Sequence, residues 1–220
     1  MSDSRHFASF DNRFYWRCES CEATYLDPTM LPSADEERSI YLLHRNDADD
    51  PGYRKYLEPI AESLLGRLRP GSRGLDYGCG PDSALAAMLR EAGHDVALYD
   101  PLFHPDSDAL ARQYDFITCS EVIEHFHRPY REFAKLDAML GPGGILAIMT
   151  RFLTDSMDFQ RWHYRRDPTH VVFYREQTLR QVAHRFGWVC AIPCANVALL
   201  SKPAIKVDAA TADWVPTREI

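Results

Sequence analysis

Short apolar runs alternate with amphipathic stretches along most of the chain. Residues 145–150 are almost entirely apolar, and residues 94–99 are apolar from Val96 onward, as expected for strands of a parallel sheet that is covered on both faces. Between such runs, apolar residues recur at three- and four-residue steps, which indicates helices that pack one side against the sheet. The pattern therefore predicts an α/β fold. Strands are expected around 75–77 and at 94–99, 114–119, 145–150, 188–192 and 196–201, and helices at 34–44, 53–68, 129–140 and 176–186 and after residue 84.

A glycine-rich turn, in the sequence RGLDYGCGPDSAL, follows the first of these strands. Gly78 and Gly80 allow the backbone to approach a ligand closely, and a helix begins directly after them. This arrangement suits either a dinucleotide or S-adenosylmethionine. Asp76 stands just before the turn, where its carboxylate would repel a pyrophosphate and attract the amino group of a methionine moiety. The turn therefore favours S-adenosylmethionine.

The second strand ends at Asp100, 22 residues beyond Gly78. An acidic side chain at this place can hold both hydroxyls of a ribose. Only about a dozen residues separate Asp100 from the next strand, too few for an ordinary helix-strand-helix unit. The sheet is therefore expected to lack or shorten the strand-helix unit after Asp100. Candidate adenine contacts are Leu102, Phe103 and Ser120.

The long segment 151–174 contains RWHYRRDPTHVVFY and is rich in aromatic residues, histidine and arginine. A connection of this length is usually functional or mobile. Arginine beside aromatic rings can bind a phosphate, a carboxylate or a stacked ring, although a solvated loop would have the same composition. We expect this segment to recognise the acceptor. The acceptor-binding candidates are Glu121, Glu124, Arg161, Trp162, Tyr164 and Tyr174.

Residues 1–32 are aromatic and lack a helical pattern, and we expect them to be irregular. Cys18 and Cys21 have the spacing of half a zinc site, which would need two further ligands. His6, His44 or the pair Cys190 and Cys194 could supply them. The alternative is a pair of small thiols that packs a hairpin.

Length, charge and hydrophobicity exclude some classes of function but do not identify one. A chain of 220 residues, 45% hydrophobic, can bury one main core. The net charge of −7 and the pI of about 5.7 provide no broad cationic field for nucleic acid. No apolar run approaches 18 residues, so we expect no membrane span and a cytoplasmic location. The expected organisation is an N-terminal extension at 1–50 with the cysteine pair and a helix, a cofactor-binding domain at 51–202 and a tail at 203–220.

The segments RGLDYGCG, ALYD, YDFITCSEVIEHF and LGPGGILAIMT resemble those of class I S-adenosylmethionine-dependent methyltransferases. The resemblance covers residues 57–201. It implies a three-layer Rossmann-like fold whose mostly parallel sheet has an antiparallel last strand. It also implies that Asp76, Gly78 and Gly80 bind the methionine part, that Asp100 binds the ribose and that Ser120 contacts the cofactor. The N-terminal YWRCESCEATYLDP resembles a zinc-ribbon-like segment that lacks its first cysteine pair.

The resemblance implies an in-line transfer of a methyl group from a sulfonium to a nucleophile. We expect a small-molecule acceptor methylated at oxygen, which requires removal of a proton. His125 and His170 are candidates for the base, because neutral imidazole is available near pH 7. Each could equally hold the loop by bonding a backbone group.

Three other interpretations remain open. Glu121, Glu124 and His125 have the spacing i, i+3 and i+4, and with His170 they could hold a divalent metal. This pattern is similar to that of small-RNA 3′-terminal 2′-O-methyltransferases, whose metal holds the ribose hydroxyls, although the acidic net charge argues against RNA. The second interpretation is a nicotinamide-dependent oxidoreductase, and the third is a non-catalytic protein that binds S-adenosylmethionine. Our main prediction needs no metal.

Overall fold

The computed structural model describes residues 4–43 and 48–204 of the chain. His44, the expected end of the first helix, lies outside the described residues, and so do residues 205–220 of the expected tail. The helix itself, α1, is described at Ala34–Tyr41.

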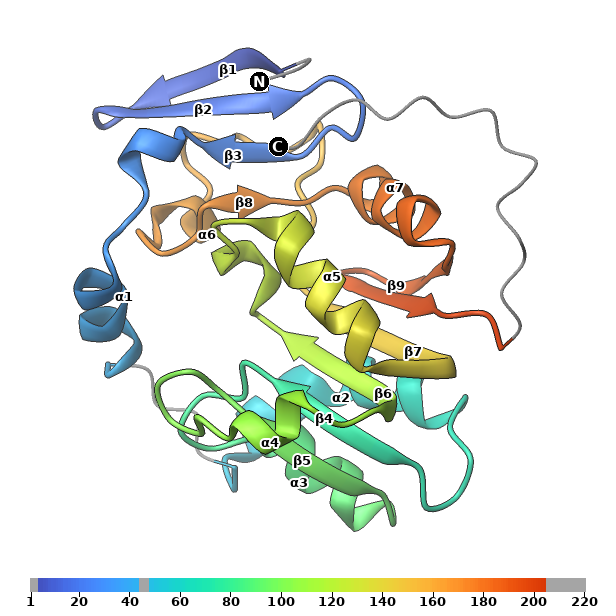
Figure 1. The fold of residues 1–220 in the computed structure, drawn as a ribbon. Coiled ribbons are helices and arrows are strands. Elements are labelled where there is room, and N and C mark those ends of the chain that lie inside the picture. The colour runs from blue at the N-terminus through green and yellow to red at the C-terminus, as the bar shows by residue number, and fades with distance from the viewer. Residues whose placement is uncertain (1–3, 44–47, 205–220) are drawn as a thin grey trace.

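A six-stranded sheet forms the centre of the molecule, with the strand order β5-β4-β6-β7-β10-β9 (Figure 1). The pairs β4–β5, β4–β6 and β6–β7 are parallel, whereas β10 is antiparallel to both β7 and β9. The mostly parallel sheet with an antiparallel last strand is therefore confirmed. Its strands are β4 (Arg73–Tyr77), β5 (Asp95–Tyr99), β6 (Tyr114–Ser120), β7 (Leu140–Met149), β9 (Val189–Cys194) and β10 (Val197–Ser201).

Helices cover both faces of this sheet. The apolar side of α2 (Pro51–Leu65) and that of α3 (Ala84–Glu91) bury Leu57, Ile60 and Leu89 in one cluster with side chains of β7 and β10. Helices α5 (Pro129–Met139) and α7 (Glu176–Phe186) belong to the second cluster. Helices on both faces of a central sheet confirm the predicted three-layer α/β architecture. The three- and four-residue periodicity indicated this arrangement, because it marks the sides of helices that pack against a sheet.

The sheet ends at β5, directly before Asp100. Between β5 and β6 the chain forms only the four-residue helix α4 (Ser107–Leu110) and an isolated bridge between Asp100 and His104. The strand-helix unit expected to be missing after Asp100 is indeed absent from this connection.

The N-terminal residues differ from the expectation of irregular structure. They form the strands β1 (Ser4–Phe10), β2 (Arg13–Cys18) and β3 (Thr24–Leu26), which join β8 (Val172–Phe173) in a second sheet of order β1-β2-β3-β8. In Figure 1 the blue strands lie beside orange β8, far from it in sequence. β3 forms as a strand next to β8, a partner that is distant in the sequence. Local periodicity cannot reveal such a partner. A short 3₁₀ turn, η1 (Pro28–Met30), then leads toward α1.

The turn GPGG after α5 was expected to stand outside the sheet. Instead, β7 already begins at Leu140, and Gly143 takes a left-handed backbone angle within it (φ 77°). The register of β6 and β7 shifts between Tyr114 and Phe116 to accommodate these extra residues.

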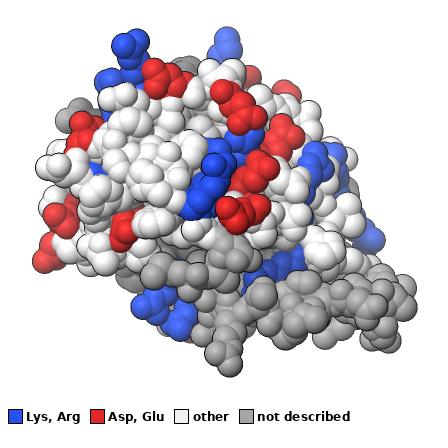
Figure 2. All heavy atoms as spheres, turned by 90° about the horizontal axis from the view of Figure 1, so that it is seen from above, with Lys and Arg blue, Asp and Glu red and all other residues white. Residues whose placement is uncertain are grey.

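Charges of both signs lie close together on the face that the second sheet presents. Figure 2 shows Lys and Arg side chains next to Asp and Glu side chains among the described residues of this face. Ion pairs of this region include Arg175 with Glu22 and Asp155, and Arg165 with Asp11. The charges of the described residues are therefore partly paired on this side of the molecule.

Across residues 4–43 and 48–204, none of the helices combines the length and the hydrophobicity that crossing a bilayer would require.

A test of the sheet packing is Gly74→Ala, in β4. A Cβ there would lie 2.1 Å from two carbons of the buried Phe116 ring, so the ring must shift. Overpacking of this kind costs about 1–3 kcal/mol, and urea denaturation should show a lower free energy of unfolding. Gly66→Ala is the control, because its Cβ would meet only the Glu62 carbonyl oxygen at 3.6 Å. Equal stability of the two variants would contradict this account of the packing.

Candidate active site

The glycine turn between β4 and α3 forms one wall of a cavity. Gly78 and Gly80 have left-handed backbone angles (φ 76° and 69°), which residues with a Cβ rarely adopt. A Cβ on Gly78 would lie 2.7 Å from both methyl groups of Val122. The Gly78 and Cys79 N–H groups donate to the Tyr99 carbonyl oxygen, which fixes the turn to the end of β5. The turn thus has a set shape that leaves room for a ligand.

Asp76 is buried beneath this turn. Its carboxylate accepts hydrogen bonds from the Ser83 and Thr118 hydroxyls, each at 2.5 Å. Burial raises the pKa of Asp76, although both hydroxyls act in the opposite direction. Ser83 is also the N-cap of α3, since its Oγ accepts from the Ala86 N–H. Asp76 therefore holds β6 and the start of α3 to the turn.

Asp100 connects the glycine turn to the loop that follows β5. One carboxylate oxygen accepts from the Gly80 N–H at 3.1 Å, and the other from the Leu102 and Phe103 N–H groups at 2.8 and 3.1 Å. A carboxylate has about four lone-pair sites, so it retains the capacity to bind hydroxyls. Of the two expected adenine contacts in this loop, Phe103 lines the cavity, whereas Leu102 contributes its N–H to Asp100.

A cavity of about 650 Å³ lies against these groups. Its size is within the usual range for small-molecule sites. All five expected cofactor residues line it, namely Asp76, Gly78, Gly80, Asp100 and Ser120, together with Glu121, His125 and His170. The Oγ of Ser120 is buried and has no hydrogen-bond partner within the described part of the chain. A polar group left in this state fits a site that a polar ligand completes.

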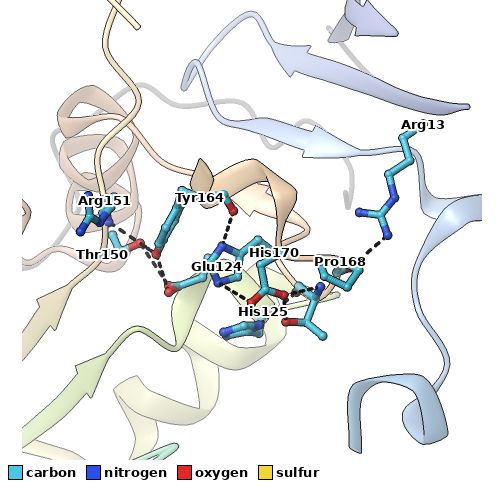
Figure 3. Close-up of polar contacts among 10 residues, drawn as sticks. Arg13, Glu124, His125, Thr150, Arg151, Tyr164, Pro168 and His170 are labelled. Atoms are coloured by element: carbon cyan, nitrogen blue, oxygen red, sulfur yellow. Dashed lines mark hydrogen bonds and ion pairs between the residues drawn. The ribbon is translucent and has the colours of Figure 1, made fainter. Parts of the chain in front are cut away.

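The side chain of Glu124 is fully buried below the cavity. It follows β6 in the short 3₁₀ turn η2 (Ile123–His125). Its carboxylate accepts hydrogen bonds from the Tyr164 hydroxyl at 2.5 Å and the Thr150 hydroxyl at 3.1 Å (Figure 3). Burial, and then the neighbouring Glu121, raise the pKa of Glu124 well above its usual value.

His125 and His170 both line the cavity with fixed ring orientations. The Nδ1 of His125 lies 3.0 Å from the Thr169 carbonyl oxygen, and that of His170 lies 2.7 Å from the Tyr164 carbonyl oxygen. Carbonyl oxygens only accept, so each Nδ1 must carry the proton, and in the neutral ring the lone pair is on Nε2. The two rings lie edge to face, with centroids 4.7 Å apart.

Three of the four expected metal ligands come together. One ligand atom each from Glu124, His125 and His170 lies within 4.8 Å of the others. Glu121 is outside this group, although it contacts Glu124 and accepts a hydrogen bond from the Tyr56 hydroxyl at 2.8 Å. Glu121 has a left-handed backbone (φ 54°), which is uncommon outside glycine.

The structure does not bring the aromatic candidates of segment 151–174 to the cavity lining. Trp162 packs against Phe173 and Tyr164 in the core, and Tyr174 is buried with its hydroxyl donating to the Ile123 carbonyl oxygen. Arg161 is exposed and lies 3.7 Å from Asp158. The buried aromatic candidates belong to the core instead, because the segment folds into α6 (His163–Arg166) and β8 rather than an open binding loop.

The chain before the glycine turn contributes further cavity residues, and the sequence pattern did not identify those of α1. Glu37 and Tyr41 of α1 line the cavity, as does Tyr53 of α2. Glu37 pairs with the His127 Nε2 at 2.8 Å, and the Tyr41 ring lies edge-on to that of His125. The helical pattern located α1, but only the path of the chain places it over the cavity.

Cys18 and Cys21 lie at the turn between β2 and β3. Within the described residues, no third Cys, His, Asp or Glu joins them in a group that could hold a metal. A structural zinc site needs four ligands, so the described residues do not support a zinc site here.

Comparisons with known proteins agree with this geometry. Residues 49–191 match a sequence family described as a methyltransferase domain. No curated protein matches the chain. The fold is similar to that of 1,6-didemethyltoxoflavin-N1-methyltransferase from Burkholderia thailandensis, solved with 1,6-didemethyltoxoflavin and S-adenosylhomocysteine (16% identity, TM-score 0.54, 92% of this chain and 100% of that one). It is also similar to that of CalO1, a methyltransferase in calicheamicin biosynthesis, in its SAH-bound form (12% identity, TM-score 0.52, 78% of this chain and 59% of that one).

The raised pKa of Glu124 predicts a pH-dependent stability. Above about pH 5 an ordinary glutamate in the unfolded chain has lost its proton, whereas folded Glu124 keeps it to a higher pH. The folded state then binds more protons, so the free energy of unfolding falls as the pH rises through the folded pKa. Glu124→Gln should reduce this fall between pH 5 and 8 in urea titrations with EDTA. The exposed Glu58→Gln is the control and should behave as wild type; equal pH dependence of all three proteins would contradict the assignment.

Proposed function

The chain belongs to the methyltransferase domain family, and from this premise we propose that it transfers a methyl group from S-adenosylmethionine to a hydroxyl of a small-molecule acceptor. We choose oxygen as the methylated atom because two histidines line the cavity, and in the neutral ring of each the lone pair is on Nε2. A hydroxyl must lose its proton as it attacks, and an imidazole can accept it near neutral pH.

The cofactor is proposed to occupy the part of the cavity beside the glycine turn. Gly78 and Gly80 let the methionine portion approach the backbone, and Asp100 has the remaining capacity to bind ribose hydroxyls. The Ser120 hydroxyl needs a partner that such a ligand can supply. Both similar solved methyltransferases contain S-adenosylhomocysteine, which supports this placement.

Alignment of the two reactants is the main task of such a site. Holding a nucleophile and a sulfonium in attack geometry can contribute about 7–11 kcal/mol, and a positioned base adds about 100- to 10,000-fold. We propose His125 and His170 as alternative bases. The Asp167 carboxylate lies 3.9 Å from His170 Nε2, where it can stabilise the imidazolium that forms. Burial opposes ionisation of Asp167, but the Thr169 hydroxyl and N–H, together with His170 and His125, lower its pKa.

Family membership overturns the alternative of a nicotinamide-dependent oxidoreductase. Family membership also favours an enzyme over a non-catalytic binder. The two histidines that line the cavity beside the glycine turn support the same choice.

A metal-assisted methyl transfer is the second candidate, and the grouping of Glu124, His125 and His170 favours it. A carboxylate and two imidazoles suit a divalent ion. Bound there, the ion would polarise the acceptor hydroxyl. An RNA ribose as the acceptor is less favoured, because the net charge is −7.

Binding of S-adenosylhomocysteine tests the cofactor assignment. Isothermal titration should show that the wild-type protein binds S-adenosylhomocysteine and does not bind NADH. Gly78→Ala should weaken binding about tenfold, because forcing an L-residue into the left-handed region costs about 1–2 kcal/mol and its Cβ meets Val122. Gly66→Ala, far from the turn, should bind as wild type. Binding of NADH in place of S-adenosylhomocysteine would refute the proposal.

Mn²⁺ binding distinguishes the two candidate functions without a known acceptor. If a metal is used, electron paramagnetic resonance should detect one tightly bound Mn²⁺ that is lost in His170→Asn and retained in the exposed His184→Asn. The main proposal predicts no such ion. It also predicts that, once a mass-shift screen of hydroxyl compounds finds the acceptor, EDTA leaves turnover unchanged while His125→Asn or His170→Asn lowers it about 100-fold or more.

A further inference from the structure

The turn that contains Cys18 and Cys21 is a compact unit at the surface. Cys18 is the last residue of β2, and its N–H donates to the Ala23 carbonyl oxygen at 2.9 Å. The Glu22 N–H donates back to the Cys18 carbonyl oxygen at 3.0 Å, and Glu22 has a left-handed backbone (φ 62°). The chain therefore closes on itself across the two cysteines. Both side chains are held at the same end of the hairpin.

The two thiols influence each other electrostatically. The Cys18 sulfur lies 3.1 Å from the Ser20 hydroxyl, and Cys21 is the largest influence on the pKa of Cys18. Although burial acts in the opposite direction, the bonds from Cys21, Ser20 and nearby N–H groups lower the pKa of Cys18 to about 5. The pKa of Cys21 is raised, first because its proton is shared with Cys18. The lowered pKa of Cys18 favours its thiolate at neutral pH, whereas the raised pKa of Cys21 keeps that side chain a thiol.

Helix α7 fixes the turn from outside. The Thr178 hydroxyl donates to the Cys21 carbonyl oxygen at 2.8 Å, and Arg175 pairs with Glu22 at 3.0 Å. The turn that contains both cysteines is thus held in place by residues at the start of α7. The other cysteines have no comparable arrangement. Cys79 and Cys119 are buried, and burial raises the pKa of each.

We propose that Cys18 and Cys21 form a redox-active dithiol that hydrogen peroxide converts to an intramolecular disulfide. The Cys18 thiolate attacks one peroxide oxygen and breaks the O–O bond, which gives a sulfenic acid and hydroxide. The Cys21 sulfur then attacks the sulfenic sulfur, the S–S bond forms, and water leaves with the sulfenic oxygen. Two electrons pass from the two sulfurs to the peroxide. Peroxide is small enough to reach Cys18, which is 4% exposed, through the half-buried Cys21 and the exposed Glu19 and Ser20.

The test uses the full-length, reduced and metal-free protein. After a short exposure to equimolar peroxide at pH 7, free thiols are blocked with N-ethylmaleimide and the protein is digested with trypsin. Cleavage after Arg17 and Arg38 puts both cysteines on one peptide, 18–38. We expect this peptide to lose both maleimide groups, to be two hydrogens lighter than the reduced form, and to recover both thiols with dithiothreitol. A thiolate reacts faster than a thiol, so this pair should oxidise about tenfold or more faster than exposed Cys194.

Two variants separate the steps. In Cys21→Ser the sulfenic acid of Cys18 has no partner, so dimedone should label Cys18 after peroxide. The matched control Cys194→Ser, at the exposed end of β9, should form the disulfide as wild type does. If Cys21→Ser fails to fold, the peptide analysis of the wild-type protein still tests whether the disulfide forms. Maleimide on both cysteines after peroxide, slower oxidation than Cys194, or one zinc per chain retained by this pair in fresh protein would each overturn the proposal.

Discussion

The site depends on the burial of the Glu124 carboxyl group. A carboxyl group without contact to water must have its hydrogen bonds supplied by the protein, and these come from the end of β7 through Thr150 and from α6 through Tyr164. The main chain of η2 adds two further links, since the Glu124 carbonyl oxygen accepts from the Val171 N–H and the Ile123 carbonyl oxygen accepts from the Tyr174 hydroxyl. These links place His170 beside His125.

This requirement explains why the N-terminal strands belong to the same structure as the cofactor turn. The segment that supplies Tyr164 and His170 is held from outside by β3, which pairs with β8, and by the Leu26 N–H, which donates to the Val171 carbonyl oxygen. The buried guanidinium of Arg165 is satisfied partly by Asp11 and the Tyr15 hydroxyl. One apolar cluster runs continuously from Tyr15 and Leu26 to side chains of the central sheet. A boundary at residue 50 therefore divides the sequence but not the core.

The two halves of the site differ in how far the sequence could predict them. The proposed cofactor half follows largely from local rules, because an apolar strand, glycines that take left-handed angles and a capped helix lie within a dozen residues. The cavity lining includes all the residues expected there except Leu102. The acceptor half is assembled from α1, α2, η2 and segment 151–174, and no local pattern states which side chains will meet. The mixture of arginine and aromatic residues in that segment suggested a binding loop. In the folded chain Trp162 and Arg165 instead fill a core around Tyr15, because an arginine with enough fixed acceptors can be buried.

The charge state of the neighbouring Glu121 and Glu124 side chains limits which mechanism of methyl transfer the site can use. Two carboxylates in contact in a buried place repel strongly, so they cannot both remain charged unless a cation or a proton lies between them. Burial raises the pKa of Glu121 above its usual value, and the hydrogen bonds of Tyr56 and Tyr164 and the charge of Arg151 offset this only in part. With a shared proton, the pair is a singly charged unit that interacts with Tyr56 and Tyr164, and under the main proposal the histidines remove the proton of the acceptor. With a divalent ion, Glu124 would be a ligand, and His125 and His170 would bind the metal through their lone pairs. The two mechanisms therefore exclude each other at this site, because each Nε2 lone pair can bind either a proton or a metal.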